Sequence, residues 1–271
     1  MTDSTWLNEA IRLRESGMSY NNIAKQLGKC KRTVSYRLQE LGYKPKRECK
    51  NFVQNQPNKK YINENYFETI DTEHKAYWLG FMYADGYVGH DNRVELALKE
   101  EDYEHVLKFK NDLESEHKIN KKTKKVNGKI FYGYKLSVIR KKLRQDLENK
   151  GCIPNKSKIL KYPTIEQVPL DLQRHFIRGY IDGDGCISNP DSNRFVLDIV
   201  GTEDFLNGIN NYFKLEPGQN IYSFKHSDVK HFSKGGKFAY DMMTHLYENA
   251  TIYLERKHER YLGFAVLFRN E

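Results

Sequence analysis

The first 43 residues contain three short stretches in which apolar residues recur three and four positions apart. This spacing predicts three amphipathic helices, at residues 5–15, 20–27 and 33–41. Ser19 is a suitable N-cap for the second helix, and Gly28 separates that helix from the third. Two short helices joined by a glycine turn, after a preceding helix, are typical of a helix-turn-helix. We therefore expect residues 1–43 to form a small all-α helix-turn-helix domain.

The pattern changes after residue 43. Residues 44–65 have few apolar positions, two prolines and many charges, which predicts a basic linker. Beyond it, the largely apolar segments Trp78–Gly86 and Ile177–Gly185 resemble each other, and both end in Asp-Gly. We infer that the rest of the chain contains an internal repeat.

The similarity of the two copies continues downstream in the same order. Each copy has an alternating strand, at 94–98 and 195–199, followed by an amphipathic helix and a hairpin, at 121–138 and 220–238. The first hairpin turns at Asn-Gly, which is a strong hairpin signal. We therefore expect an α+β fold of tandem pseudo-symmetric αββαββα repeats. Their expected bounds are 66–165 and 166–271.

Charge is concentrated at the N-terminus of the 271-residue chain. The net charge is +9, and residues 1–60 contain 13 Lys/Arg but only 5 Asp/Glu. Such a segment favours nucleic acid or an anionic membrane surface as its partner. Cationic and hydroxyl side chains at the start of the third helix suit phosphate and base-edge contacts in DNA. An extended basic linker could also follow a DNA groove.

Other features limit the classes of protein. The mean hydropathy is −0.80 and no apolar run approaches the roughly 20 residues of a membrane span, so we expect no membrane partner. Residues 1–5 lack the charged leader and the apolar segment that we would expect of a signal peptide, and the four cysteines form no Cys-x-x-Cys pair. We expect a cytoplasmic protein, from a bacterial or phage-infected cell, without a zinc site or disulfide framework.

Basic residues also dominate the first hairpin. From Lys118 to Arg144 there are eleven Lys/Arg and no acid. Because the apolar positions of an open sheet face its helices, we expect the cations to line the other face and to meet an anion. The side chains that we expect to contact DNA are Lys29, Lys31, Arg32, Thr33, Tyr36, Arg37, Lys46, Arg47, Arg93, Lys99, Lys121, Lys124, Lys135, Arg194, Lys225 and Lys237.

The repeated segments also carry candidate metal ligands. Small residues four positions apart, Gly80 with Ala84 and Gly179 with Gly183, would let the two helices approach closely. Asp85 and Asp184 would then meet at the C-terminal ends of these helices, where the helix dipole disfavours a carboxylate. Two crowded carboxylates need a compensating cation, and a hard divalent ion such as Mg²⁺ suits them.

These paired motifs resemble those of LAGLIDADG homing endonucleases in their monomeric, two-motif form. The resemblance covers about residues 61–271. It implies that the two motif helices form an interface, that Asp85 and Asp184 bind catalytic divalent metals, and that the sheets contact double-stranded DNA. Basic residues near the active site of that family correspond here to Lys156 and Lys257, which would act as catalytic residues.

We therefore expect a monomeric, Mg²⁺-dependent DNA endonuclease. It would make a double-strand break in a long asymmetric site, for homing of an intron or mobile element. The alternatives are a DNA-binding transcriptional regulator or an intron maturase on the same scaffold. Both acids are present, which favours the nuclease, since binding alone does not need them.

Overall fold

A computed structural model describes residues 3–43, 60–188, 194–224 and 229–268. The chain divides into two compact units, residues 1–59 and 60–271. The expected linker residues Lys46 and Arg47, and Lys225 of the second hairpin, lie outside the described residues.

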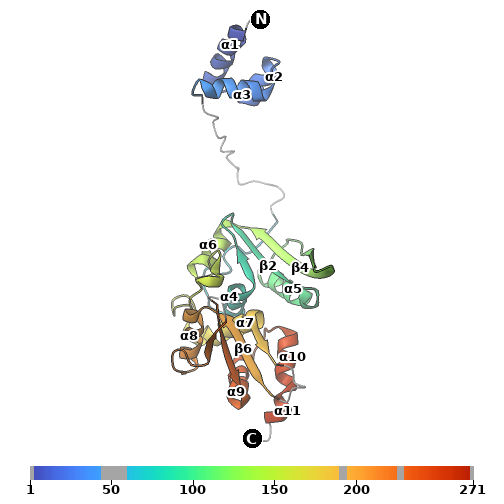
Figure 1. Cartoon of the computed structure of the whole chain (residues 1–271), viewed down its shortest axis with the longest axis vertical. Coiled ribbons are helices and arrows are strands. Elements are labelled where there is room, and N and C mark those ends of the chain that lie inside the picture. Colours follow the sequence, from blue (N-terminus) through green and yellow to red (C-terminus); the bar gives the residue numbers. More distant parts are fainter. Residues whose placement is uncertain (1–2, 44–59, 189–193, 225–228, 269–271) are drawn as a thin grey trace. The chain divides into compact units, whose positions relative to one another are not determined.

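The N-terminal unit consists of three helices, α1 (Asp3–Glu15), α2 (Tyr20–Gln26) and α3 (Lys31–Glu40), as the sequence predicts. Ser19 caps α2, and its hydroxyl accepts a hydrogen bond from the Asn22 amide. The apolar faces of the helices pack into a separate small core, which includes Trp6, Ile23 and Leu38. The unit therefore has its own hydrophobic core. Figure 1 shows its three helices.

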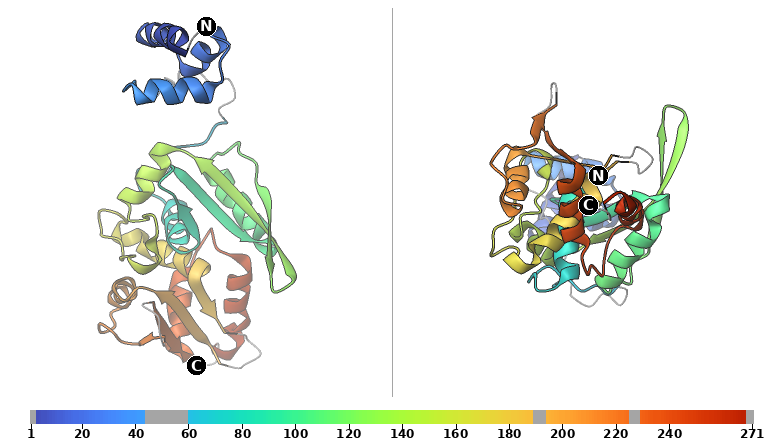
Figure 2. Two further views of the ribbon diagram at one scale, coloured as in Figure 1. Left: turned by 45° about the horizontal axis from the view of Figure 1, so that its top comes forward. Right: turned by 90° about the horizontal axis from the view of Figure 1, so that it is seen from below.

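The second unit begins with the first of two similar repeats. Its elements are α4 (Glu73–Ala84), β1 (Gly86–Val88), β2 (Arg93–Lys99), η1 (Glu100–Asp102), α5 (Tyr103–Asp112), β3 (Asn120–Val126), β4 (Lys129–Ile139) and α6 (Lys141–Asn149), followed by the short turn η2 (Lys156–Lys158). The strands form an antiparallel sheet of order β1-β2-β4-β3, from which the β3–β4 hairpin projects (Figure 2).

The second repeat has the same order of elements. After the turn η3 (Leu170–Leu172) come α7 (Gln173–Asp184), β5 (Gly185–Ile187), β6 (Val196–Gly201), α8 (Glu203–Tyr212), β7 (Ile221–Ser223), β8 (Lys230–Gly235), α9 (Gly236–Tyr247), α10 (Glu255–Gly263) and α11 (Ala265–Phe268). Its sheet has the order β5-β6-β8-β7. The matching sheet orders confirm the tandem αββαββα fold.

Two boundaries differ from the expected ones. Residues 60–65 belong to the second unit rather than to a linker, because Ile62 is buried in its core and the Tyr61 amide donates to the Glu116 carboxylate. The second hairpin strand ends at Gly235, not at residue 238. Gly236, at φ +76°, has a left-handed backbone conformation that glycine adopts easily, and α9 begins there.

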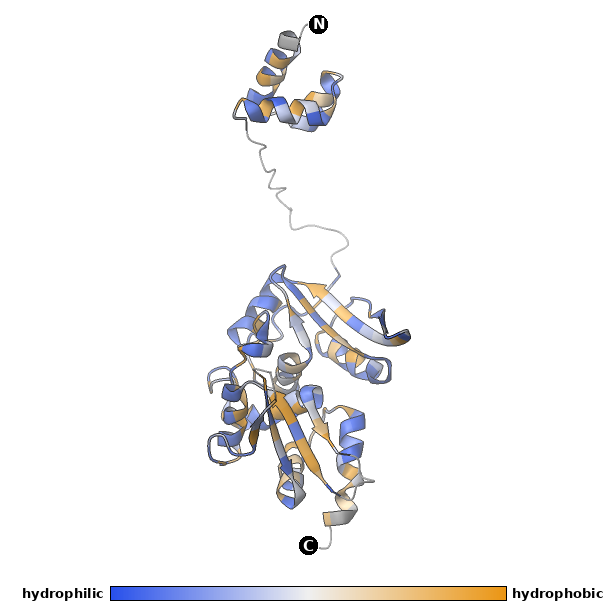
Figure 3. Cartoon of the chain, viewed as in Figure 1, coloured by the Kyte–Doolittle hydropathy of each residue, from blue (hydrophilic) through white to orange (hydrophobic). Residues whose placement is uncertain are grey.

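One continuous core joins the two repeats. Strands of both sheets show hydrophobic segments (Figure 3). On β2, buried Val94 and Leu96 alternate with half-exposed Arg93 and Glu95, so one sheet face packs on helices. No helix of the described residues is long and apolar enough to cross a membrane.

Candidate active site and nucleic-acid interface

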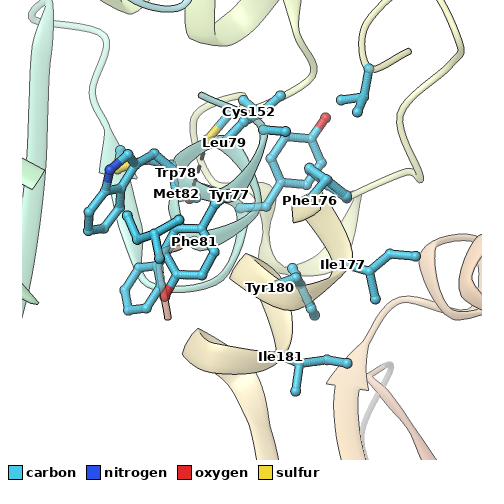
Figure 4. Packing of buried hydrophobic residues seen from close by; sticks show 14 of the residues in the cluster. Tyr77, Trp78, Leu79, Phe81, Met82, Cys152, Phe176, Ile177, Tyr180 and Ile181 are labelled. Carbon is cyan, nitrogen blue, oxygen red and sulfur yellow. Dashed lines mark hydrogen bonds between the residues drawn. The ribbon is translucent and has the colours of Figure 1, made fainter. Parts of the chain in front are cut away.

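The helices α4 and α7 approach each other closely at their small residues, as the sequence predicts. A Cβ atom added to Gly80 would lie 1.9 Å from the Phe176 carbonyl oxygen, and one added to Gly179 would lie 2.0 Å from that of Tyr77. A Cβ on Gly183 would lie 2.3 Å from the Ala84 Cβ. Larger side chains at these three positions would therefore push the helices apart. Figure 4 shows the buried residues of both helices around this contact.

This packing brings Asp85 and Asp184 together at the adjoining ends of the helices. Asp85 is the C-cap of α4, and Asp184 is the last residue of α7. Both side chains are exposed on one side, but the surrounding protein removes water from them. That desolvation, with repulsion from Asp85, raises the pKa of Asp184 to about 6. Desolvation also raises the pKa of Asp85, although Lys257 and Lys156 oppose the rise.

Lys257 lies at the same end of α7 and is almost fully buried. Its Nζ donates hydrogen bonds to the carbonyl oxygens of Ile181 (2.7 Å), Gly183 (3.0 Å) and Gly185 (2.6 Å). These contacts satisfy carbonyls at the C-terminus of the helix, where a cation also complements the helix dipole. Burial lowers the pKa of Lys257 to about 8. Because all three N–H groups are used, Lys257 acts on the acids through its charge in this conformation.

Lys156 occupies the corresponding position in the first repeat. Its Nζ donates to the Gly86 carbonyl oxygen at 2.5 Å, just as Lys257 contacts Gly185. The carbonyl of Met82, which corresponds to Ile181, instead accepts a hydrogen bond from the buried Cys152 thiol (Figure 4). Both lysines lower the pKa of both acids, so all four residues predicted for the active site come together.

The donor set of this site fits a hard divalent cation that is shared with a ligand. Asp85 and Asp184 offer carboxylate oxygens, and both are accessible from outside. Within the described part of the chain, no cluster of three or more His, Cys, Asp or Glu could form a closed metal site. Mg²⁺ is commonly bound by one or two carboxylates together with water and phosphate. The two acids fit that chemistry, whereas a closed zinc cage would need more ligands.

The outer face of the first sheet, opposite the helices, is basic. Arg93, Lys99 and Lys135 lie on it, because they alternate with buried residues of β2 and β4. On β3 the register places Lys124 opposite Phe131 and Lys122 opposite Gly133, on this same outer face. Lys122 was not among the expected DNA contacts, although strict alternation from Lys124 would have indicated it.

Lys121, however, is not on the outer face. It is three residues from Lys124, so the pleat directs it to the opposite side of the sheet. There it lies over the Tyr132 ring, 4.2 Å from its centroid, and pairs with Glu100 at 3.1 Å. The expectation that Lys121 lines the DNA-facing surface is wrong for this reason.

Intramolecular carboxylates neutralise many cations of the first repeat. The pairs include Arg93–Asp91, Lys99–Glu101, Lys121–Glu100, Lys135–Glu95, Arg140–Glu64, Lys142–Glu68, Lys142–Asp146 and Arg144–Glu148. The expectation that these charges must await an external anion is therefore too strong. Lys122 and Lys124 are exposed on the projecting hairpin and remain the clearest candidates for phosphate contacts.

The outer face of the second sheet is much less basic. The register places Asp198, Tyr222, His231 and Ser233 there. Arg194 lines a hollow on this face together with Asn220, Tyr222 and Ser233. Lys237 is a different case, because it lies on α9 and pairs with Asp241 at 2.8 Å. The prediction that Lys237 belongs to the hairpin is wrong, because the strand ends at Gly235.

In the N-terminal unit, the residues predicted to contact DNA lie on or just before α3. Lys29, Lys31, Arg32, Thr33, Tyr36 and Arg37 are all exposed. Ser35 and Gln39, which the sequence reasoning missed, line a shallow hollow with Arg32 and Tyr36. The Gln39 amide donates to the Ser35 hydroxyl at 2.9 Å. Ser35 lies four residues after Lys31, and Gln39 lies four residues after Ser35. This helical spacing, which places them on the same face of α3, would have indicated both residues.

Comparison with family models found no match for the sequence, and comparison with curated proteins found none either. Among solved structures, the LAGLIDADG meganuclease I-AabMI bound to uncleaved DNA is 12% identical, with a TM-score of 0.46 over 74% of this chain and 92% of that one. The LAGLIDADG homing endonuclease I-LtrWI bound to target DNA is 13% identical, with a TM-score of 0.46 over 77% of this chain and 93% of that one. The LAGLIDADG meganuclease I-CpaMI bound to uncleaved DNA is 14% identical, with a TM-score of 0.47 over 74% of this chain and 93% of that one. In structure, the chain is similar to these LAGLIDADG endonucleases.

Proposed function

We propose that the protein is a site-specific endonuclease that makes a divalent-metal-dependent double-strand break in DNA. The observation that carries this proposal is the meeting of Asp85 and Asp184 at the ends of two close-packed helices, with Lys156 and Lys257 beside them. Bringing two partly desolvated, mutually repelling carboxylates together is unfavourable and adds nothing to the binding of a polyanion. A catalytic cation offsets that repulsion.

Each part of the chain has a role in this proposal. Asp85 and Asp184 would bind Mg²⁺, which supplies charge neutralisation at the scissile phosphates when it is bound. The positive charges of Lys156 and Lys257 oppose the rise in the pKa of both carboxylates and so favour their ionised, metal-binding form. The outer face of the first sheet and α3 of the N-terminal unit would bind DNA, largely through phosphates.

The proposed biological role is homing of an intron or mobile element, by a monomer in the cytoplasm. The monomer follows from the presence of both αββαββα repeats in one chain. One polypeptide thus supplies two different halves, which suits an asymmetric DNA site. A long site needs no second chain in this arrangement.

The proposal can be tested with a library of randomised DNA incubated with the protein and Mg²⁺. The ends of the cut molecules are sequenced, and a parallel selection in Ca²⁺ recovers DNA that is only bound. We expect the same long asymmetric sequence in both pools, with cut ends at a fixed position. Recovery of a tightly bound sequence that is never cut would contradict the nuclease and favour a transcriptional regulator.

A further inference from the structure

Asp182, two residues before the metal-binding candidate Asp184, is fully buried and accepts three hydrogen bonds. The donors are the Tyr77 hydroxyl (2.8 Å), the Tyr247 hydroxyl (2.8 Å) and the Leu254 amide (2.7 Å). Burial raises the pKa of Asp182, and the charge of Lys257 and these three hydrogen bonds oppose the rise. Asp182 therefore does not point to the open side of the site, where Asp85 and Asp184 lie.

One of these hydrogen bonds crosses between the repeats. Tyr77 is on α4 of the first repeat, whereas Asp182 is on α7 of the second. The Tyr77 oxygen also lies 2.9 Å from Nε2 of His105. Burial lowers the pKa of His105 to about 3, so the ring is neutral, and its Nε2–H donates to Tyr77 while Tyr77 donates to Asp182. A directed chain thus runs from His105 through Tyr77 to Asp182.

The other end of the network fixes the segment that leads into α10. The Leu254 amide, immediately before this helix, donates to Asp182. The preceding residues are fixed from both repeats as well: the Thr251 amide donates to Glu73 of α4, and the Ile252 carbonyl accepts from the buried Arg178 of α7. Lys257 follows three residues after Leu254, and its amide donates to the Leu254 carbonyl. The position of Leu254 therefore sets that of Lys257.

The first repeat has no equivalent of this network among the described residues. Tyr83 stands where Asp182 stands in the second motif, and its hydroxyl donates to the Lys150 carbonyl within its own repeat at 2.5 Å. Lys156 has one hydrogen bond to a helix-end carbonyl, whereas Lys257 has three. Among the described residues, this hydrogen-bond network is thus found only in the half of the site that contains Lys257.

Resting on the proposed endonuclease function, we propose that Asp182 is a positioning residue for Lys257. Its hydrogen bonds to Tyr77 of the first repeat and to Leu254 of the second fix the start of α10, and so place the Lys257 ammonium group at the end of α7.

A double-mutant cycle tests this proposal, because a residue that acts through Lys257 loses its effect when Lys257 is absent. Tyr77→Phe is the mild variant, since it removes the hydrogen bond to Asp182, together with the one that His105 donates, and keeps the aromatic ring. We expect it to slow single-turnover cleavage of the cognate duplex about tenfold, as for loss of one hydrogen bond to a charged group. In the Lys257→Met background the same change should slow cleavage less than about twofold.

Asp182→Asn should show the same non-additivity with a larger effect, and Tyr77→Phe alone carries the test if Asp182→Asn does not fold. Tyr83→Phe is the matched control, because it removes a buried tyrosine hydrogen bond from the other repeat. Its effect should be the same with Lys257 or Met at position 257. An equal loss for Tyr77→Phe in both backgrounds would overturn the positioning role alone. A wild-type protein that cuts no DNA would overturn the proposed function as well.

Discussion

Lys156 and Lys257 occupy matching places in the two repeats, yet their surroundings differ. Lys257 is buried, donates to three carbonyls of the motif helix and depends on a carboxylate that both repeats contact. Lys156 is half-buried and donates to one carbonyl. The same fold has therefore produced one rigidly defined half of the site and one more open half. Duplication of a structural unit does not require equal chemistry in the two copies.

The largest expected effect comes from the two acids, at which the halves are most alike. Asp85→Asn and Asp184→Asn keep the side-chain shape but remove the charge that would bind a metal. Cleavage should fall by about two to three orders of magnitude or more, because charge at the scissile phosphates is no longer neutralised. Single-turnover cleavage in Mg²⁺ measures this, beside a binding titration in Ca²⁺. Binding should persist, and equal loss of binding and cleavage would argue for misfolding instead.

Substitution of the two lysines should show the difference between the repeats, because the variants should lose different amounts of stability. Lys257→Met leaves three helix-end carbonyls and the buried Asp182 without their cation, so we expect a loss of about 3 kcal/mol in the free energy of unfolding. Lys156→Met removes one hydrogen bond at a half-exposed site, and about 1 kcal/mol is expected. Urea denaturation of both variants at neutral pH gives these values. Equal losses would break the comparison between the repeats.

The pH dependence of stability should reveal the crowded acids. The pKa of Asp184 rises from an ordinary 3.8 to about 6 in the folded protein. The folded state therefore binds its proton more tightly than the unfolded state, and this contribution to stability is lost as pH rises from about 4 to 6. Without divalent cations, Asp184→Asn should gain stability relative to the wild type over that range. A difference that does not vary with pH would mean that Asp184 is neither desolvated nor repelled by Asp85.

The smallest expected effect concerns the outer faces of the sheets. Lys122→Ala and Lys124→Ala on the first sheet should each reduce the salt dependence of DNA binding by about 0.9 in log–log slope, if each contacts a phosphate. Ser233→Ala on the second sheet should leave the slope unchanged, because no cation is removed. Fluorescence titrations at several salt concentrations measure the slopes. A larger change in the slope for the second-sheet variant would contradict the assignment of the main phosphate contacts to the first sheet.

Much of this architecture could be predicted from the sequence, because it depends on local signals. The repeated Asp-Gly motifs, the small residues four apart and the Asn-Gly turn predicted the helix pair, the acids and the first hairpin. The predicted end of the second hairpin was wrong, because α9 begins at Gly236 and the spacing of apolar residues did not indicate this start. Lys121 was assigned to the outer face of the first sheet, although strict alternation along β3 places it on the face opposite to that of Lys124.

The positioning network could not be predicted in this way. Asp182 and Tyr77 are 105 residues apart, and their hydrogen bond exists only because glycines let α4 and α7 approach closely. In the sequence, Asp182 is one of two acids in a short motif, with nothing to indicate that it turns inward. Such contacts depend on the packed geometry of both repeats rather than on a pattern within either one.

We propose that one chain contains a complete but unequal site for cleavage of both DNA strands. The most direct test is strand-resolved, single-turnover cleavage of the selected duplex by the wild-type protein in Mg²⁺, with the stoichiometry of the complex measured by sedimentation. We expect one chain per duplex and cleavage of both strands at different rates. A duplex that is bound tightly but stays intact, or that needs two chains to be cut, would contradict it.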